Sequence, residues 1–158
     1  MNTSLAVPAP MPAPPTQTDS TFISNVLTRV NNYRKQHSAA ALTWDATLAA
    51  YARTQANGCK AVHTGKYGEN IYNFWTTDPN PNFTTWTNSA IDFWMSEAPK
   101  YTVSNPAPAY HFTQLVWKSS KRIGCAWSVS KCPDTNYYFY CEFDPMGNIA
   151  GQFAANVS

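Results

Sequence analysis

Two segments near the C-terminal end constrain the fold most, because each consists of two interleaved sets of side chains. The first set is Ile123, Cys125, Trp127 and Val129, then Tyr137, Phe139, Cys141 and Phe143; the second is Gly124, Ala126 and Ser128, then Tyr138, Tyr140 and Glu142. A period of two is the signature of a β-strand, whose successive side chains point to opposite faces of a sheet. A turn-prone stretch around Pro133 separates the segments, so we predict an antiparallel hairpin.

Apolar residues at helical spacing predict three helices ahead of this hairpin. These run from Asp19 or Ser20 to Gln36, from Thr43 or Asp45 to Asn57-Gly58, and from Thr85 to Ala98, where Pro99 stops the third. The Asn-Gly pair suits a left-handed residue at a helix end. Residues 67–75 are predicted to form a strand. The continuously apolar run 110–117 fits either a helix or a strand, and we favour a short helix. Helices and strands without regular alternation indicate an α+β class.

The first 18 residues differ in composition from the rest of the chain. Five of the twelve prolines fall there among alanines, which favours an extended tail and supplies no core. We therefore predict a disordered tail over 1–18 and one domain over 19–158. No apolar run approaches the roughly 18 residues of a membrane span, so a transmembrane protein is not expected. A net charge of +2 with 13% charged residues argues against nucleic acid as a partner.

Four cysteines without a Cys-x-x-Cys pair favour two disulfides over a redox or zinc motif. Disulfides persist in oxidising compartments, and three glycosylation sequons, at Asn2, Asn82 and Asn156, fit a secreted, extracellular protein. The N-terminus lacks the charged start and apolar run of a signal peptide, so we expect any such leader to have been removed already.

The few histidines and glutamates are candidates for chemistry. His63, Glu69, Glu97 and His111 all lie beside predicted loops or element ends. Imidazole nitrogens and carboxylate oxygens that converge in a cleft could bind zinc and leave a position for water. The spacing alone does not bring them together, so ordinary surface or hydrogen-bonding roles remain the simpler interpretation. No nucleophile elbow or glycine-rich phosphate loop is present, which disfavours triad proteolysis and nucleotide cofactors.

Aromatic residues gather between positions 71 and 94. The candidates for gripping an apolar ligand such as a sterol or a fatty acid are Tyr72, Phe74, Trp75, Phe83 and Trp86. A mobile aromatic loop is one way to bind a flat hydrocarbon. Core packing is the competing interpretation for each ring, and it is weakest for Phe83 and Trp86, which border the proline-rich stretch.

Several separated strings together resemble the CAP superfamily, which joins cysteine-rich secretory, antigen-five and pathogenesis-related class one proteins. The strings are Asn31-Asn32-Tyr33-Arg34, Leu42-Thr43-Trp44-Asp45, Tyr67-Gly68-Glu69-Asn70-Ile71, Trp94-Met95-Ser96-Glu97, His111-Phe112-Thr113-Gln114-Leu115-Val116-Trp117, and Cys141-Glu142-Phe143-Asp144-Pro145-Met146-Gly147-Asn148. The resemblance covers about residues 20–153.

The resemblance implies a secreted, three-layer α-β-α sandwich of the CAP type with a central antiparallel sheet. It further implies a cleft in which His63 and His111 are metal ligands, with zinc the first choice, and Glu69 and Glu97 orient water or complete the shell. From the family pattern, disulfides are then expected to pair Cys59 with Cys132 and Cys125 with Cys141.

Three functions follow as expectations. The leading one is a pathogenesis-related, fungal-type protein that is not an enzyme and binds a sterol or fatty acid. Fungal sterol-binding members carry an aromatic-x-aromatic-x₄-aromatic loop; Tyr72 and Phe74 fit it, and Pro79 stands in the third place. The alternatives are a zinc-dependent hydrolase or peptidase that uses the four cleft residues, and a secreted effector that acts on a host or cell-surface protein.

Overall fold

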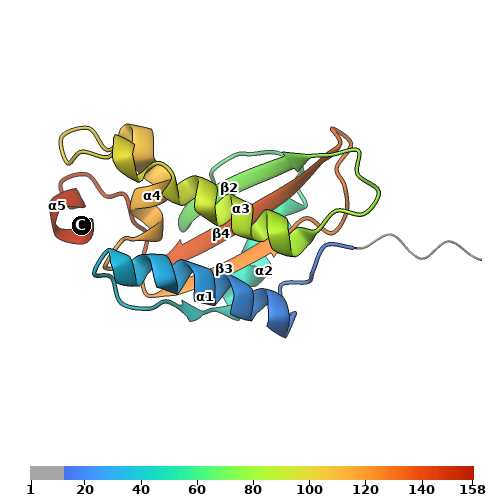
Figure 1. Cartoon of the computed structure of the whole chain (residues 1–158), viewed down its shortest axis with the longest axis horizontal. Helices are drawn as coiled ribbons and strands as arrows, with labels where there is room; N and C mark the ends of the chain where they lie inside the picture. Colours follow the sequence, from blue (N-terminus) through green and yellow to red (C-terminus); the bar gives the residue numbers. More distant parts are fainter. Residues whose placement is uncertain (1–12) are drawn as a thin grey trace, which may run out of the picture.

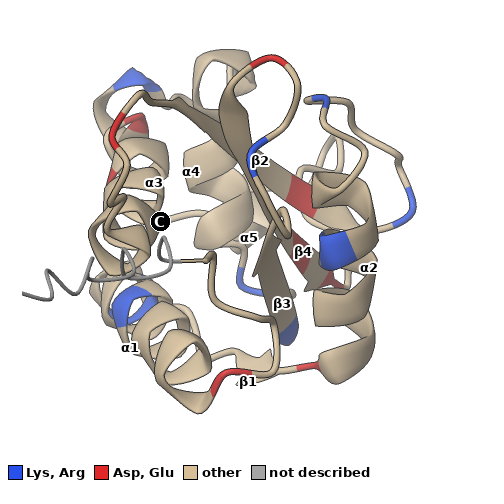
Figure 2. Ribbon diagram, turned by 90° about the vertical axis from the view of Figure 1, so that its right-hand side faces the viewer, with Lys and Arg blue, Asp and Glu red and all other residues tan. Residues whose placement is uncertain are grey.

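The computed structural model describes residues 13–158, which form three layers. A four-stranded sheet lies in the middle, helices α1 and α3 cover one face, and α2 covers the other (Figures 1 and 2). The elements are α1 (Ser20–Gln36), β1 (Thr43–Trp44), α2 (Ala46–Ala56), β2 (Gly68–Trp75), α3 (Phe83–Met95), α4 (Tyr110–Leu115), β3 (Arg122–Trp127), β4 (Asn136–Asp144) and α5 (Phe153–Asn156). The α-β-α sandwich is confirmed.

The sheet has the strand order β1-β3-β4-β2. Strands β3 and β4 form the predicted antiparallel hairpin, and their register places Cys125 directly opposite Cys141. Strand β2 also pairs with β4 in antiparallel orientation, from Gly68 opposite Phe143 to Trp75 opposite Asn136. The two-residue β1 runs parallel to β3, so the sheet is mixed at that edge where an entirely antiparallel one was expected.

The helix boundaries follow their capping residues. Asp19 and Asp45 accept hydrogen bonds from the first turns of α1 and α2, as predicted. Helix α3 begins two residues earlier than predicted, because Asn82 accepts from the backbone N–H of Thr85 at 3.0 Å. The left-handed residue after α2 is Cys59, with φ of 54°, and not the Asn-Gly pair.

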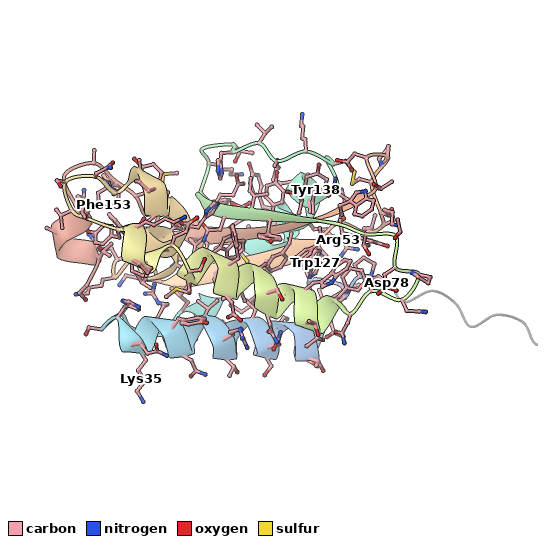
Figure 3. The ribbon with its side chains drawn as sticks, turned by 45° about the horizontal axis from the view of Figure 1, so that its top comes forward. Lys35, Arg53, Asp78, Trp127, Tyr138 and Phe153 are labelled. Atoms are coloured by element: carbon pink, nitrogen blue, oxygen red, sulfur yellow. A yellow bond between two sulfur atoms is a disulfide. The ribbon has the colours of Figure 1, made fainter. Side chains whose placement is uncertain are left out.

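The two faces of the sheet bury different kinds of side chain. The face toward α1 and α3 carries large aromatic residues such as Trp127, whereas the face toward α2 packs Tyr138 against the alanines of that helix (Figure 3). Gly124 lies on this second face, and a Cβ there would stand 2.2 Å from the backbone nitrogen of Ala49. Helix α2 therefore approaches the sheet so closely that only glycine fits at position 124.

Both expected disulfides are present, joining Cys59 to Cys132 and Cys125 to Cys141. Most of the expected tail lies outside the described residues. Its described part, 13–18, contacts the domain: Pro14 is buried, and the carbonyl of Pro15 accepts from Arg53 at 3.4 Å. Within residues 13–158, no helix is long and apolar enough to cross a membrane.

Candidate functional site

The two histidines and two glutamates singled out in the sequence line one cleft of about 440 Å³. His63 comes from the loop after α2, Glu69 from the start of β2, Glu97 from the turn after α3, and His111 from α4. Positions 63 and 111 are far apart in the chain, so tertiary folding alone brings them to the same hollow. Within the cleft the four side chains form two separate His–Glu pairs.

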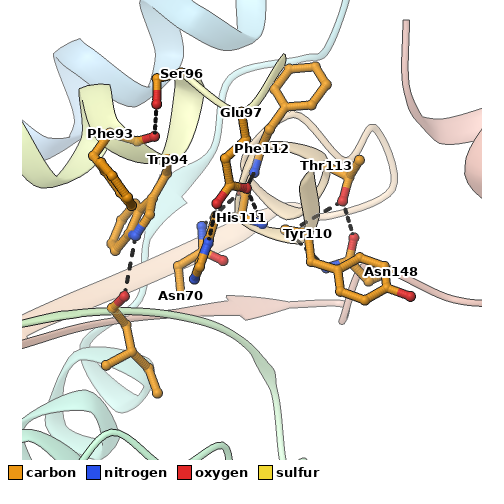
Figure 4. Close-up of polar contacts among 11 residues, drawn as sticks. Asn70, Phe93, Trp94, Ser96, Glu97, Tyr110, His111, Phe112, Thr113 and Asn148 are labelled. Carbon is orange, nitrogen blue, oxygen red and sulfur yellow. Dashed lines mark hydrogen bonds and ion pairs between the residues drawn. The ribbon is translucent and has the colours of Figure 1, made fainter. Parts of the chain in front are cut away.

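Glu97 orients His111 and the start of α4. Its Oε1 lies 2.7 Å from Nδ1 of His111, and its Oε2 accepts from the backbone N–H groups of His111 and Phe112 at 3.0 and 3.3 Å (Figure 4). The ring of Trp94 stacks beside the imidazole, with centroids 6.2 Å apart and planes 15° apart. With Nδ1 held by Glu97, Nε2 is the nitrogen of His111 left for a ligand.

The second pair has the same pattern in a more open setting. Nδ1 of His63 lies 2.9 Å from Oε1 of Glu69. The imidazole is 63% exposed, whereas the carboxylate is only 2% exposed. The hydrogen bond to Glu69 raises the pKa of His63, with a further contribution from the negative charge of that carboxylate, against the opposing effect of burial.

The cleft floor is built around Gln114, a buried residue of α4. Its Oε1 accepts from the backbone N–H of Gly147 at 2.8 Å, and its Nε2 donates to Ser120 Oγ at 3.2 Å. A Cβ at Gly68 would stand 2.2 Å from that Oε1, and one at Gly147 would stand 2.8 Å from it. Two glycines are thus required for strand β2 and the 145–149 loop to close around the amide.

The C-terminal end of helix α4 is hydrogen-bonded to Arg34, a fully buried residue of α1. Its guanidinium donates to the carbonyls of Leu115 and Trp117 at 3.0 and 2.9 Å, and to those of Ala40 and Ser120. Burial lowers the pKa of Arg34 to about 10. Since cations are favourable at a helix C-terminus, this contact fixes the helix that carries His111.

Glu142 is an acid near the cleft that the sequence analysis did not assign to the site. It is fully buried on β4, directly opposite Glu69 on β2. Among the described residues, neither of its carboxyl oxygens has a hydrogen-bond partner, and the same holds for Oε2 of Glu69. Burial first, and then the neighbouring Glu69, raise the pKa of Glu142 to about 10. A protonated Glu142 can donate to Oε2 of Glu69, which gives a partner to that oxygen and to one of the two oxygens of Glu142.

The residues in the cleft offer two imidazoles to a metal. Within the described part of the chain, no three His, Cys, Asp or Glu side chains gather closely enough to form a metal-binding group. A divalent ion held here would therefore be bound by the Nε2 atoms of His63 and His111, with water in its remaining positions. In each pair a glutamate holds Nδ1 and fixes the orientation of the ring, as carboxylates do behind metal-binding histidines.

The aromatic candidates divide by burial. Phe83 is a core residue, 6% exposed, and packs on Trp127 and Tyr137. Phe83 does border the proline-rich loop, as the first residue of α3, but its ring turns into the core, so core packing is its role in the structure. Trp75 is 65% exposed and belongs to no aromatic pair among the described rings.

The three remaining candidates cluster with Phe93 of α3, another of the aromatic residues between positions 71 and 94. Tyr72 contacts both Phe74 and the half-exposed Phe93, and Phe74 stacks on Trp86 with centroids 4.8 Å apart. Tyr72, Phe74, Trp86 and Phe93 form one partly exposed surface between β2 and α3, which we call the aromatic face.

Comparison with known proteins decides the family. Residues 27–143 match the cysteine-rich secretory protein family, CAP. The chain belongs to this family. The CAP chain is 35% identical over 145 residues to Secreted protein PRY1 of Candida albicans, which covers 88% of this chain and 33% of that protein. It is 34% identical over 133 residues to a PR-1 type pathogenesis-related protein of Sambucus nigra. That match covers 77% of this chain and 75% of the relative.

Solved CAP structures share the fold. BmVAL-1 superposes with a TM-score of 0.73 at 22% identity, covering 87% of this chain and 83% of that one. NaASP2 with Zn²⁺ superposes with a TM-score of 0.69 at 19% identity, and the match covers 87% of this chain and 86% of that one. The chain spans 33 to 41% of the length of three fungal relatives, two of which are named as secreted proteins.

Proposed function

We propose that this CAP protein is secreted and acts by binding a small hydrophobic ligand, a sterol or a fatty acid, without catalysing a reaction. The observation that carries the proposal is the aromatic face, where four rings from β2 and α3 contact one another and stay partly open to solvent. Burial of a ligand methylene group contributes about 0.8 kcal/mol, so a long acyl chain or a sterol needs no strong polar anchor there. Secretion is supported by the names of the fungal relatives and by the two disulfides.

We expect Phe93→Ala to weaken sterol or fatty-acid binding by at least tenfold, because a half-exposed ring that packs on the ligand contributes about 1.5 kcal/mol or more. Equilibrium binding of a fluorescent sterol and a fluorescent fatty acid to the purified chain measures this. Phe93 suits the test because it is half exposed, whereas removal of the core residue Phe83 would disturb folding.

Two matched variants complete that experiment. Trp75→Ala removes an exposed ring outside the aromatic face, and Val103→Ala removes an exposed apolar side chain from another loop. Retained binding in Val103→Ala with loss in Phe93→Ala supports the aromatic face. Loss confined to Trp75→Ala would move the site to the 75–82 loop. Absence of binding to the unchanged chain would refute the proposal.

A second candidate function, binding of a divalent metal ion, is favoured by the paired geometry of the cleft. In both pairs a glutamate holds Nδ1 and leaves Nε2 for a ligand. The similar structure of NaASP2 with Zn²⁺ adds support for zinc as the ion. When bound, zinc would lower the pKa of a coordinated water, which is the chemistry that a hydrolase of this fold would need. Glu69 and Glu97 would contribute by orienting the two imidazoles, because each holds an Nδ1 atom.

We expect Glu97→Gln to weaken zinc binding about 10- to 100-fold, because a side chain that orients a metal-bound histidine contributes on that scale. Isothermal titration with zinc measures the affinity, with His111→Ala as the variant that removes a proposed ligand and His37→Ala as the control outside the cleft. Equal affinity in all four proteins would rule out the cleft as the metal site. A peptide-library digest of the same samples tests the hydrolase: zinc-dependent cleavage lost in His111→Ala would make the chain an enzyme.

A further inference from the structure

The structure separates the two described sequons into opposite environments. Asn82 is exposed at the first turn of α3, and Thr84, which completes its sequon, is exposed as well. Asn156 is 5% exposed in α5, where it is enclosed by the segment that follows α4. The third sequon, at Asn2, lies outside the described residues.

Hydrogen bonding at Asn82 leaves the reactive atom free. Its Oδ1 accepts from the backbone N–H of Thr85 and caps α3, while its Nδ2 makes no hydrogen bond to the described residues. N-glycosylation replaces one hydrogen on Nδ2 and leaves Oδ1 unchanged. A sugar at Asn82 is therefore compatible with the helix cap and projects into solvent.

Asn156 uses its whole side chain to hold the C-terminal segment. Its Oδ1 accepts from the backbone N–H and the hydroxyl of Ser119 at 3.0 and 2.6 Å, and its Nδ2 donates to the carbonyl of Gln152 at 3.0 Å. A sugar on this buried nitrogen would have to displace α5 from the residues after α4. The folded chain thus has room for a glycan at Asn82 and none at Asn156.

We propose that Asn82 carries an N-linked glycan in the secreted protein and that Asn156 is unmodified. The donor is a lipid-linked oligosaccharide diphosphate. The bond from sugar C1 to the diphosphate oxygen breaks, Nδ2 of Asn82 forms a bond to C1, its proton passes to a base, and the lipid diphosphate leaves. The proposal rests on the proposed secretion through a glycosylating pathway.

The position of the glycan leaves the cleft accessible. Asn82 stands at the N-terminal end of α3, and Glu97 follows the C-terminal end of the same helix (Figure 1). The 13 residues of α3 span roughly 20 Å at the usual rise per residue, so the sugar and the His–Glu pairs lie at opposite ends. Removal of the glycan should leave zinc affinity unchanged.

The test is secretion of the full chain from a eukaryotic host, followed by peptide N-glycosidase and peptide mass mapping. The enzyme converts a glycosylated asparagine into aspartate, so an occupied Asn82 is identified directly. Two variants each destroy one sequon and keep its asparagine: Thr84→Ala and Ser158→Ala. We expect Thr84→Ala to lose the glycan at Asn82, and Ser158→Ala to keep it and to show the same mass change as the unchanged chain.

A third variant, Asn82→Asp, removes the acceptor nitrogen and keeps an oxygen that can cap α3. It should be secreted in folded form without the glycan at this position, which separates loss of modification from loss of fold. An unmodified Asn82 in the secreted chain, or a glycan on Asn156, would overturn the proposal. Neither result depends on whether the chain binds a sterol, a fatty acid or zinc, so failure of the ligand proposals remains distinguishable.

Discussion

Replacement of Glu142 by glutamine is expected to stabilise the fold above pH 5, by an amount that grows with pH. The folded-state pKa of Glu142 is raised from its ordinary value to about 10. Between those two values the unfolded chain releases a proton that the folded chain keeps. The folded state therefore loses up to about 1.4 kcal/mol of stability per pH unit through this group. A glutamine stays neutral and can donate to Glu69, so it removes this loss.

Urea unfolding of both proteins at pH 4, 6 and 8 measures the effect. The two free energies of unfolding should be closest at pH 4, where Glu142 is largely protonated in both states, and should differ by at least about 2 kcal/mol at pH 8. Asp78→Asn, which removes one exposed carboxylate, serves as the control for the loss of an acidic side chain. Parallel pH profiles for Glu142→Gln and the unchanged chain would show that Glu142 is ionised in the fold.

The largest loss of stability is expected from Gly124→Ala, at about 3 kcal/mol. The added Cβ would lie 2.2 Å from the backbone nitrogen of Ala49 and 2.7 Å from the carbonyl oxygen of Asp45. These are backbone atoms of α2 and its cap, so no side-chain rotation can relieve the clash, and the helix must move away from the sheet. That movement would open the layer that packs Ala52 and Ala56 under Tyr140.

Gly65→Ala is the matched comparison for this prediction. Gly65 has φ of 75°, and no atom of the described residues would lie within 4 Å of an added Cβ, so alanine there costs only the backbone strain, about 1 kcal/mol. Thermal unfolding and urea unfolding of the two variants give both values. If the variants lose equal stability, the contact between α2 and β3 is looser than the structure shows.

Local sequence patterns predicted those helices and strands whose defining residues lie within the element or directly beside it. The β3–β4 hairpin follows from alternation alone, and the starts of α1 and α2 follow from Asp19 and Asp45 as caps. The start of α3 was misplaced because Pro79 and Pro81 made the neighbouring residues resemble a continuing loop. The capping oxygen of Asn82 was nevertheless present in the sequence.

The site depended on information that spacing does not hold. Contacts between His63 and Glu69, and between Glu97 and His111, arise within two separate stretches, and only the packing of α4 against β2 places both in one cleft. The family resemblance supplied that grouping. Glu142 escaped notice because an acid in an alternating strand suggests a solvent-facing position, whereas α2 and the loop after it cover this face.

The two halves of the cleft differ in stiffness. His111 lies on a helix fixed by Arg34 and Glu97, whereas His63 lies on a segment without helix or strand, most of it open to solvent. That segment is anchored at its start by the Cys59–Cys132 bond and by Tyr140, which donates to the carbonyl of Lys60. His111 is thus the fixed side of the cleft, and the segment that carries His63 is the side with fewer contacts to hold it. A ligand that contacts both imidazoles would be accommodated by movement of His63.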